Sequence, residues 1–237
     1  MLQNILEEKM AVGISKIHGV DADNFLSKVA KAYMAITGDG KGGIVCDDSL
    51  KNPVEWKQKT KEKIHFEYFD IILTNPPFGK KITVKGEDTL KQFDLSHKWK
   101  VDKDEKWIKQ ELKDVMPPQI LFIERCFSFL KENGKMGIVL PDGLLGNKDS
   151  AFIRNWISER AKIIAIIDLP METFMPNTPT KTSVIILQKT KKYLNKNYKV
   201  FMSIAETCGH DRRKKPIDSD DISIISKEFH KWSKNKV

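Results

Sequence analysis

The sequence contains few cysteines, and they form no recognisable pattern. Cys46, Cys126 and Cys208 are the three cysteines of the 237-residue chain, and none has the spacing of a metal site. An odd number of widely separated cysteines also argues against a disulfide framework. We therefore expect no metal, and we interpret Cys46 and Cys126, which lie in apolar runs, as small core residues. A reducing cytoplasm is the expected compartment.

The sequence also lacks a long apolar run and a secretion signal, so we expect no membrane segment. Apolar residues make up 40% and charged residues 31% of the chain, and its length suits one good-sized α/β domain. Lys and Arg total 41 against 32 Asp and Glu, a formal net charge of +9. This basic balance is compatible with a phosphate backbone as partner, but by itself it is weak support.

The most informative stretch joins an apolar run to a stiff turn. Phe69–Leu73 is short and apolar, a pattern that predicts a strand buried on both faces. Asn75-Pro76-Pro77-Phe78 ends the strand abruptly, because the two prolines have a fixed φ and donate no backbone hydrogen bond. Open α/β sheets place their chemistry in loops at the carboxyl ends of parallel strands. An ordinary polar turn is the alternative, since Asn-Pro dipeptides are common turn starters.

An aromatic residue directly after Asn-Pro-Pro resembles the motif of amino-group methyltransferases that use S-adenosylmethionine, chiefly the adenine-N6 DNA methyltransferases. An exocyclic amine is a poor nucleophile because its lone pair is delocalised into the ring. The side-chain oxygen of Asn75 and the carbonyl of Pro76 would accept its hydrogens and free the lone pair for attack on the sulfonium methyl group. Phe78 would stack on a base turned out of the duplex, a contact worth roughly 1–3 kcal/mol. Asn75, Pro76, Pro77 and Phe78 are the catalytic candidates.

Acidic residues follow two predicted strands before this motif. Residues 15–20 precede Asp21, and residues 43–46 precede Asp47 and Asp48. An acid after a strand of a doubly wound sheet commonly holds a ribose hydroxyl, a role that Asp21 fits. Asp48 fits an acceptor for the adenine amine of the cofactor, with Asp47 as its competitor. A helix cap or a solvated turn is the alternative for each acid.

Helices and strands are predicted for most of the remaining chain. A helix ending at Gly38 carries one apolar face, and a helix opened by Pro117 and Pro118 carries an inner stripe. The first face consists of Phe25, Leu26, Val29, Ala30 and Tyr33, and the inner stripe of Ile120, Ile123, Phe127 and Leu130. Further strands are predicted at residues 135–140, 163–167, 183–187 and 198–204, and further helices at residues 1–13, around Phe152–Ile157 and in the polar tail.

The segment from Gly79 to Met116 shows no clear periodicity. It is rich in Lys and Asp and contains Phe93, Trp99 and Trp107. Structureless segments of this length are usually functional or disordered. Because basic and aromatic residues alternate after the reactive loop, a substrate-facing lid is one interpretation, and a mobile insertion is the other.

The succession of motifs resembles the modification subunits of type I restriction systems. The matching segments, in chain order, are Gly19-Val20-Asp21, Asp48-Ser49-Leu50, Asn75-Pro76-Pro77-Phe78-Gly79, Pro118-Gln119, Leu140-Pro141-Asp142-Gly143 and Thr180-Lys181-Thr182-Ser183-Val184. Gly209-His210-Asp211-Arg212-Arg213 is similar to the segment that follows the catalytic domain in that family. The resemblance implies adenine-N6 methylation of DNA with S-adenosylmethionine as cofactor. It also implies DNA, a specificity subunit and a restriction subunit as partners.

The resemblance implies a fold and a set of site residues as well. The fold is α/β, a doubly wound, mostly parallel sheet of the S-adenosylmethionine-dependent methyltransferase type with a late antiparallel strand. Asp21 and Asp48 would hold the cofactor, and Asn75-Pro76-Pro77-Phe78 would carry the reaction. We expect a catalytic domain over residues 1–205, with residues 79–116 as an insertion or lid, and a basic extension over residues 206–237.

One feature of the family is missing from this sequence. No glycine-rich loop precedes Asp21, where the only glycines are Gly13 and Gly19. The family's N-terminal helical domain and C-terminal helices are absent too, so we expect a piece of a modification subunit, incomplete at its N-terminus. Two alternatives stay open, a methyltransferase for an RNA adenine or a protein amide, and a catalytically silent fragment that binds only DNA or partner subunits.

Overall fold

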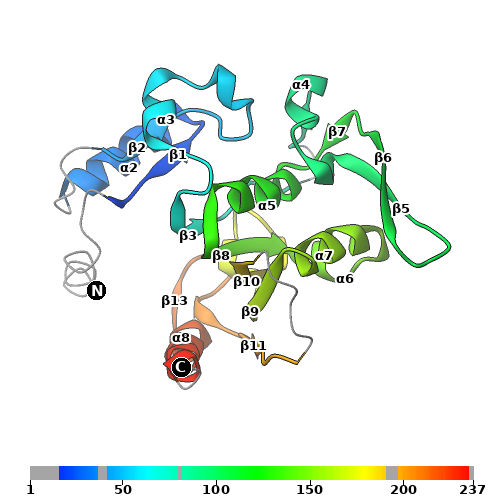
Figure 1. Cartoon of the computed structure of the whole chain (residues 1–237). Helices are drawn as coiled ribbons and strands as arrows, with labels where there is room; N and C mark the ends of the chain where they lie inside the picture. Colours follow the sequence, from blue (N-terminus) through cyan, green and yellow to red (C-terminus); the bar gives the residue numbers. More distant parts are fainter. Residues whose placement is uncertain (1–15, 37–41, 80–81, 191–196, 235–237) are drawn as a thin grey trace. The chain divides into compact units, whose positions relative to one another are not determined.

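The computed structural model describes residues 16–36, 42–79, 82–190 and 197–234 (Figure 1). It divides into two compact units, Met1–Tyr68 and Phe69–Val237. The domain boundary expected at residue 205 falls inside the second unit and stays a prediction. The helix expected over residues 1–13 lies outside the described residues.

The first unit contains a parallel pair of short strands with a helix between them in the sequence. Strand β1 pairs with β2 so that Gly19 lies opposite Ile44 and Asp21 opposite Cys46. The predicted order of strand, helix and strand is confirmed, although β1 is shorter than expected. The elements are β1 (Gly19–Asp21), α2 (Asn24–Ile36), β2 (Ile44–Cys46), η2 (Pro53–Glu55) and α3 (Gln58–Lys63).

The apolar face predicted for α2 exists, and several of its side chains are largely exposed in the part of the chain that the structure describes. Phe25 is 71% exposed, Val29 49% and Tyr33 50%. Helical spacing placed these residues on one face, but spacing alone does not determine what packs on that face. Cys46 is only half-buried, whereas Cys126 of the second unit is buried as expected. Burial raises the pKa of the Cys126 thiol to about 12.

The second unit is built on a five-stranded sheet in the order β11-β9-β10-β8-β3. Strand β3 runs parallel to β8, and β11 runs parallel to β9. Strand β10 runs antiparallel to both β8 and β9, between which it lies. The expected α/β fold, mostly parallel with one late antiparallel strand, is confirmed. The strands are β3 (Phe69–Thr74), β8 (Leu130–Pro141), β9 (Ala161–Leu169), β10 (Thr182–Lys189) and β11 (Phe201–Ile204).

Two helices bury their apolar faces in the core of this unit. The inner stripe of α5 is buried as predicted, with Ile123 fully enclosed. Helix α7 contributes Trp156, whose ring meets that of Phe127 edge to face at a centroid distance of 5.4 Å. Helix α5 lies in the connection from β3 to its parallel neighbour β8. Helix α7 lies in the connection from β8 to β9, which run in the same direction with β10 between them. The helical elements here are α5 (Pro118–Phe129), α6 (Asp142–Gly146), η4 (Lys148–Ser150), α7 (Ala151–Ser158) and η5 (Met171–Phe174).

Strand β3 is not buried on both faces, which corrects our expectation. It lies at the edge of the sheet, and Ile71 and Leu73 are 66% and 81% exposed. Among the described residues, no strand pairs with its other edge. An apolar run predicts burial only where neighbouring elements supply it, and the described elements of this unit leave Ile71 and Leu73 largely exposed.

Residues 82–116 contain short helices and strands that the sequence pattern did not predict, while the lid and the insertion both stay predictions. The elements are β4 (Val84–Lys85), α4 (Glu87–Leu90), η3 (Asp94–Ser96), β5 (His97–Val101), β6 (Trp107–Leu112) and β7 (Val115–Met116). Strands β4 and β7 have two residues each, and the helical turns α4 and η3 have four and three, so these elements are too short to show a periodicity.

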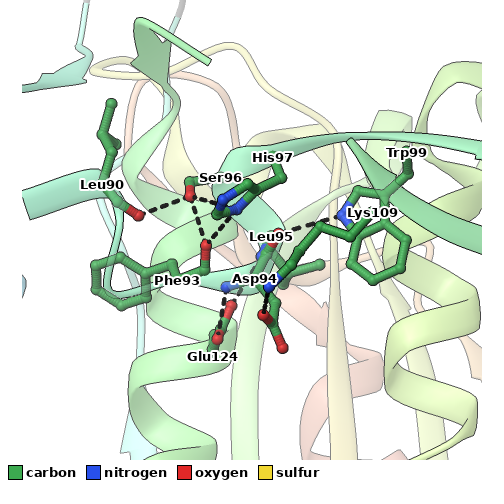
Figure 2. Close-up of polar contacts among 9 residues, drawn as sticks. All are labelled: Leu90, Phe93, Asp94, Leu95, Ser96, His97, Trp99, Lys109 and Glu124. Atoms are coloured by element: carbon green, nitrogen blue, oxygen red, sulfur yellow. Dashed lines mark hydrogen bonds and ion pairs between the residues drawn. The ribbon is translucent and has the colours of Figure 1, made fainter. Parts of the chain in front are cut away.

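The carboxylate of Glu124 on α5 joins this segment to the core of the unit. It accepts hydrogen bonds from the backbone N–H of Asp94 at 2.8 Å and of Leu95 at 2.9 Å (Figure 2). Burial raises the pKa of Glu124, and the two N–H donors offset only part of that rise. Leu90, Phe93 and Leu95 are buried alongside. The segment is therefore attached to α5 by both polar and apolar contacts.

The C-terminal residues form a hairpin and a helix. Strand β12 (Cys208–His210) pairs with β13 (Pro216–Asp220), and α8 (Asp221–Lys234) follows. The polar helix is as predicted, whereas the hairpin was not expected. Within the described ranges, no helix is both long and apolar enough to cross a membrane.

Candidate active site

The Asn-Pro-Pro-Phe loop lies where the sequence predicted it, directly after β3. Asn75 is exposed, Pro76 is buried and Phe78 is half-buried. Within the described residues the Asn75 side chain makes no hydrogen bond, so its amide oxygen is available to a ligand. Gly79 ends the loop with a φ of +146°, a conformation that residues with a Cβ rarely adopt. The buried proline and this glycine set the direction in which the chain leaves the strand.

The structure places a second aromatic ring beside the motif. Phe174, from η5, meets Phe78 edge to face with ring centroids 5.7 Å apart and planes at 79°. Our sequence reasoning did not include Phe174. The sequence offered one indication that Phe174 belongs to the site. It follows closely the strand that ends at Leu169, and loops at the carboxyl edge of a sheet meet one another.

Other motif residues gather at the carboxyl edge of the sheet. The backbone N–H of Asp142 donates to the carbonyl of Lys181 at 3.2 Å, and the Ser183 hydroxyl donates to the Asp142 carboxylate at 2.9 Å. The Lys181 ammonium pairs with the Asp168 carboxylate at 2.8 Å. The antiparallel direction of β10 explains this meeting, because its first residue lies opposite Pro141 and Leu169, the last residues of β8 and β9.

Two buried polar atoms at this edge have no hydrogen-bond partner among the described residues. They are Oδ1 of Asp168 and Oγ1 of Thr182. Most buried polar atoms in folded proteins are paired, and the exceptions need a reason. A polar ligand at this edge would satisfy them.

The three acidic candidates lie in the first unit, at the carboxyl end of the parallel pair. Asp47 is buried, and its carboxylate accepts from the backbone N–H of Asp48 and Lys57 and from the hydroxyl of Thr60, at 2.7–2.9 Å. Burial alone would raise the pKa of Asp47, but these hydrogen bonds outweigh it and lower the pKa. The carboxylate of Asp47 is therefore occupied in holding the loop after β2.

Asp48 and Asp21 have fewer internal partners. One oxygen of Asp48 accepts from the backbone N–H of Leu50 at 2.9 Å, and one oxygen of Asp21 accepts from that of Asp23 at 2.8 Å. Within the described residues, we find no further hydrogen bond to either carboxylate. Each acid thus has an oxygen available for a donor such as a hydroxyl or an amine. The register brings both acids to the same end of the strand pair, as predicted.

Comparison with known families settles which family this chain belongs to. The family described as N-6 DNA Methylase matches residues 2–237. The chain belongs to the N-6 DNA methylase family. A type I restriction enzyme EcoEI methylase subunit from Escherichia coli is 27% identical over 124 residues, 52% of this chain and 21% of that protein. The type II methyltransferase M.BstVI from Geobacillus stearothermophilus is 25% identical over 138 residues, 58% of this chain and 22% of that protein.

A solved structure agrees on the fold. The methyltransferase subunit of a type I restriction-modification system from Streptococcus thermophilus superimposes with a TM-score of 0.56 and 23% identity. The match covers 90% of this N-6 DNA methylase chain and 42% of that subunit. The regions matched in the two curated relatives amount to about one fifth of their lengths, 22% and 21%. The methylase fold is therefore shown.

Proposed function

We propose that this chain is part of an enzyme that methylates the N6 amine of adenine in DNA, within a type I restriction-modification system. The observation that carries the proposal is the Asn75-Pro76-Pro77-Phe78 loop at the carboxyl end of β3, with the Asn75 amide exposed and a second aromatic ring beside Phe78. Family membership supports the reaction class, and the relative from Escherichia coli supports the type I assignment. A specificity subunit and a restriction subunit are the proposed partners.

The loop residues have separate roles in this reaction. The Asn75 side-chain oxygen and the Pro76 carbonyl accept the two hydrogens of the exocyclic amine, and this localises the lone pair on nitrogen. The ring planes of Phe78 and Phe174 are 79° apart, so a flat base can stack on one ring and contact the edge of the other. Pro77 contributes stiffness, since its φ is fixed. Catalysis then consists mainly of orientation and of charge stabilisation.

S-adenosylmethionine is the proposed cofactor, and it would supply the methyl group when bound. Carboxylate oxygens suit its ribose hydroxyls and its adenine amine, and Asp21 and Asp48 each have an oxygen available. Asp48 is favoured over Asp47 because the oxygens of Asp47 already accept three hydrogen bonds within the unit. Asp21 is assigned to the ribose and Asp48 to the adenine.

The test measures transfer of a labelled methyl group by the assembled enzyme that contains this chain. Unmethylated DNA, RNA and protein are offered as substrates, with wild type compared with Asn75→Ala. We expect label on adenine N6 of DNA and loss of transfer in the variant with folding nearly intact, because Asn75 is an exposed loop residue. Transfer within about threefold of wild type, a 0.65 kcal/mol change or less, would remove Asn75 from the mechanism.

The two alternatives predict different outcomes. Label on RNA or protein in place of DNA would assign the same loop chemistry to another amine. Binding of DNA without any transfer would support a catalytically silent role in DNA or subunit binding.

A further inference from the structure

The basic turn of the β12–β13 hairpin contacts the short helix η5. The Arg212 guanidinium donates through Nε to the Glu172 carboxylate at 3.0 Å, and the Lys214 ammonium donates to the carbonyl of Thr173 at 3.0 Å. Both acceptors lie in η5, directly before Phe174. The hydrogen bond from Arg212 lowers the pKa of Glu172.

The turn is organised so that these two cations are held in place. The Asp211 carboxylate accepts from the backbone N–H of Arg213 at 2.8 Å and of Lys215 at 2.9 Å, which closes the turn. Lys214 has a φ of +65°, in the left-handed region that residues other than glycine rarely adopt. Such a conformation persists only where its surroundings enforce it, and it often marks a functional constraint.

The other two cations of the turn have no such partners. Arg213 and Lys215 are exposed, and their side chains make no hydrogen bond or ion pair with any described residue. Four adjacent basic residues thus separate into two that hold η5 and two that face solvent. A uniform phosphate-binding cluster would not show this division.

Strand β12 of the hairpin also lies against η5, so Arg212 and Lys214 add polar contacts to this packing. A cleft of about 570 Å³ lies between η5 and the hairpin, lined by Glu172, Thr207 and Arg212 among others. Helix η5 has four residues, and its segment contains three internal backbone hydrogen bonds, from the N–H of Thr173, Met175 and Thr178 at 2.9–3.1 Å. A helix this short is not stable by itself.

We propose that Arg212 and Lys214 are positioning residues, which hold η5 so that Phe174 stays against Phe78. The proposal rests on the proposed function, because it concerns the two rings that would hold the target base. Neither cation touches the base or the cofactor in this scheme. They act by limiting the motion of the segment that carries Phe174, so that the ring pair exists before substrate arrives.

The first test measures amide hydrogen exchange of Thr173, Met175 and Thr178 by NMR, without DNA or cofactor. Arg212→Ala and Lys214→Ala should each increase exchange by about two- to fivefold, since an exposed ion pair shifts a local equilibrium by that factor. Arg213→Ala combined with Lys215→Ala is the control, because it removes two positive charges of the same turn without touching η5. Equal exchange in the control and in the Arg212 and Lys214 variants would overturn the proposal.

The second test follows the ring pair itself. A chain labelled with 4-fluorophenylalanine gives a ¹⁹F signal for Phe174, assigned through a Phe174→Leu variant. Arg212→Glu should move this signal toward that of an exposed ring, and adding Glu172→Arg should move it back, because the ion pair is restored with reversed charges. A ¹⁹F signal of Phe174 that stays in place in both variants would refute the coupling between the hairpin and Phe174.

These measurements separate this inference from the proposed function. They need neither a methyl donor nor a target sequence, so they succeed or fail whatever reaction the enzyme performs. Conversely, transfer of the labelled methyl group to RNA or protein would change the proposed substrate without affecting the hydrogen-exchange result.

Discussion

Replacing Glu124 should loosen the folded segment of residues 82–116 from the core. This carboxylate is the acceptor for the backbone N–H of Asp94 and of Leu95, and Leu95 is completely buried. Glu124→Ala leaves both donors without an acceptor. Glu124→Gln keeps one acceptor oxygen but presents an NH₂ group to the second donor.

The size of the effect follows from the number of lost acceptors. A buried donor left unpaired costs about 1–3 kcal/mol, and relief from burying a charge returns part of this cost. We therefore expect the free energy of unfolding to fall by about 2–4 kcal/mol for Glu124→Ala and by about 1–2 kcal/mol for Glu124→Gln. Glu228→Gln is the matched control. It removes an exposed carboxylate paired with Lys231 at 2.6 Å and should cost at most about 0.5 kcal/mol.

Urea unfolding followed by circular dichroism measures these differences through the midpoint and the slope. The pH dependence gives a second check. Because burial raises the pKa of Glu124, the folded state binds this proton more tightly than the unfolded state does. The stability that this tighter proton binding adds is fully present below the pKa of Glu124 in the unfolded chain, about 4.3. It is lost as the pH rises through the pKa of Glu124 in the folded state. Wild type should lose stability relative to Glu124→Gln across that window. Equal costs for the Ala variant and the Glu228 control would refute the reasoning.

Two further predictions concern surfaces of the second unit. DNA affinity of the assembled enzyme should fall with salt, with a slope of log K on log salt of about −0.9 for each phosphate neutralised. Arg213→Ala with Lys215→Ala should make that slope shallower by about 1–2. An unchanged slope would show that these two side chains contact no phosphate. The purified chain should self-associate through β3, because no described strand pairs with its outer edge and Leu73 is 81% exposed. Leu73→Lys should reduce this association in sedimentation velocity while changing the free energy of unfolding by less than about 0.5 kcal/mol, and undiminished association would place the contact elsewhere.

Several features of this protein follow from local rules, and the sequence predicted them. Proline stereochemistry placed a stiff loop after Thr74, and helical spacing identified the buried stripe of α5 that includes Ile123. The order of strand, helix and strand placed Asp21 and Asp48 at one end of a parallel pair. Each of these predictions needs only residues that are close together in the chain.

The tertiary structure decided the features that depend on contacts between distant parts of the chain. Phe174 meets Phe78 because two loops leave the same edge of one sheet, and Glu124 meets Asp94 because α5 packs beside η3. Such pairings depend on which elements are neighbours, and hydrophobic periodicity does not contain that information. The exposure of β3 was missed for the same reason. A run of apolar residues shows that a strand can be buried, whereas the elements packed around it determine whether it is.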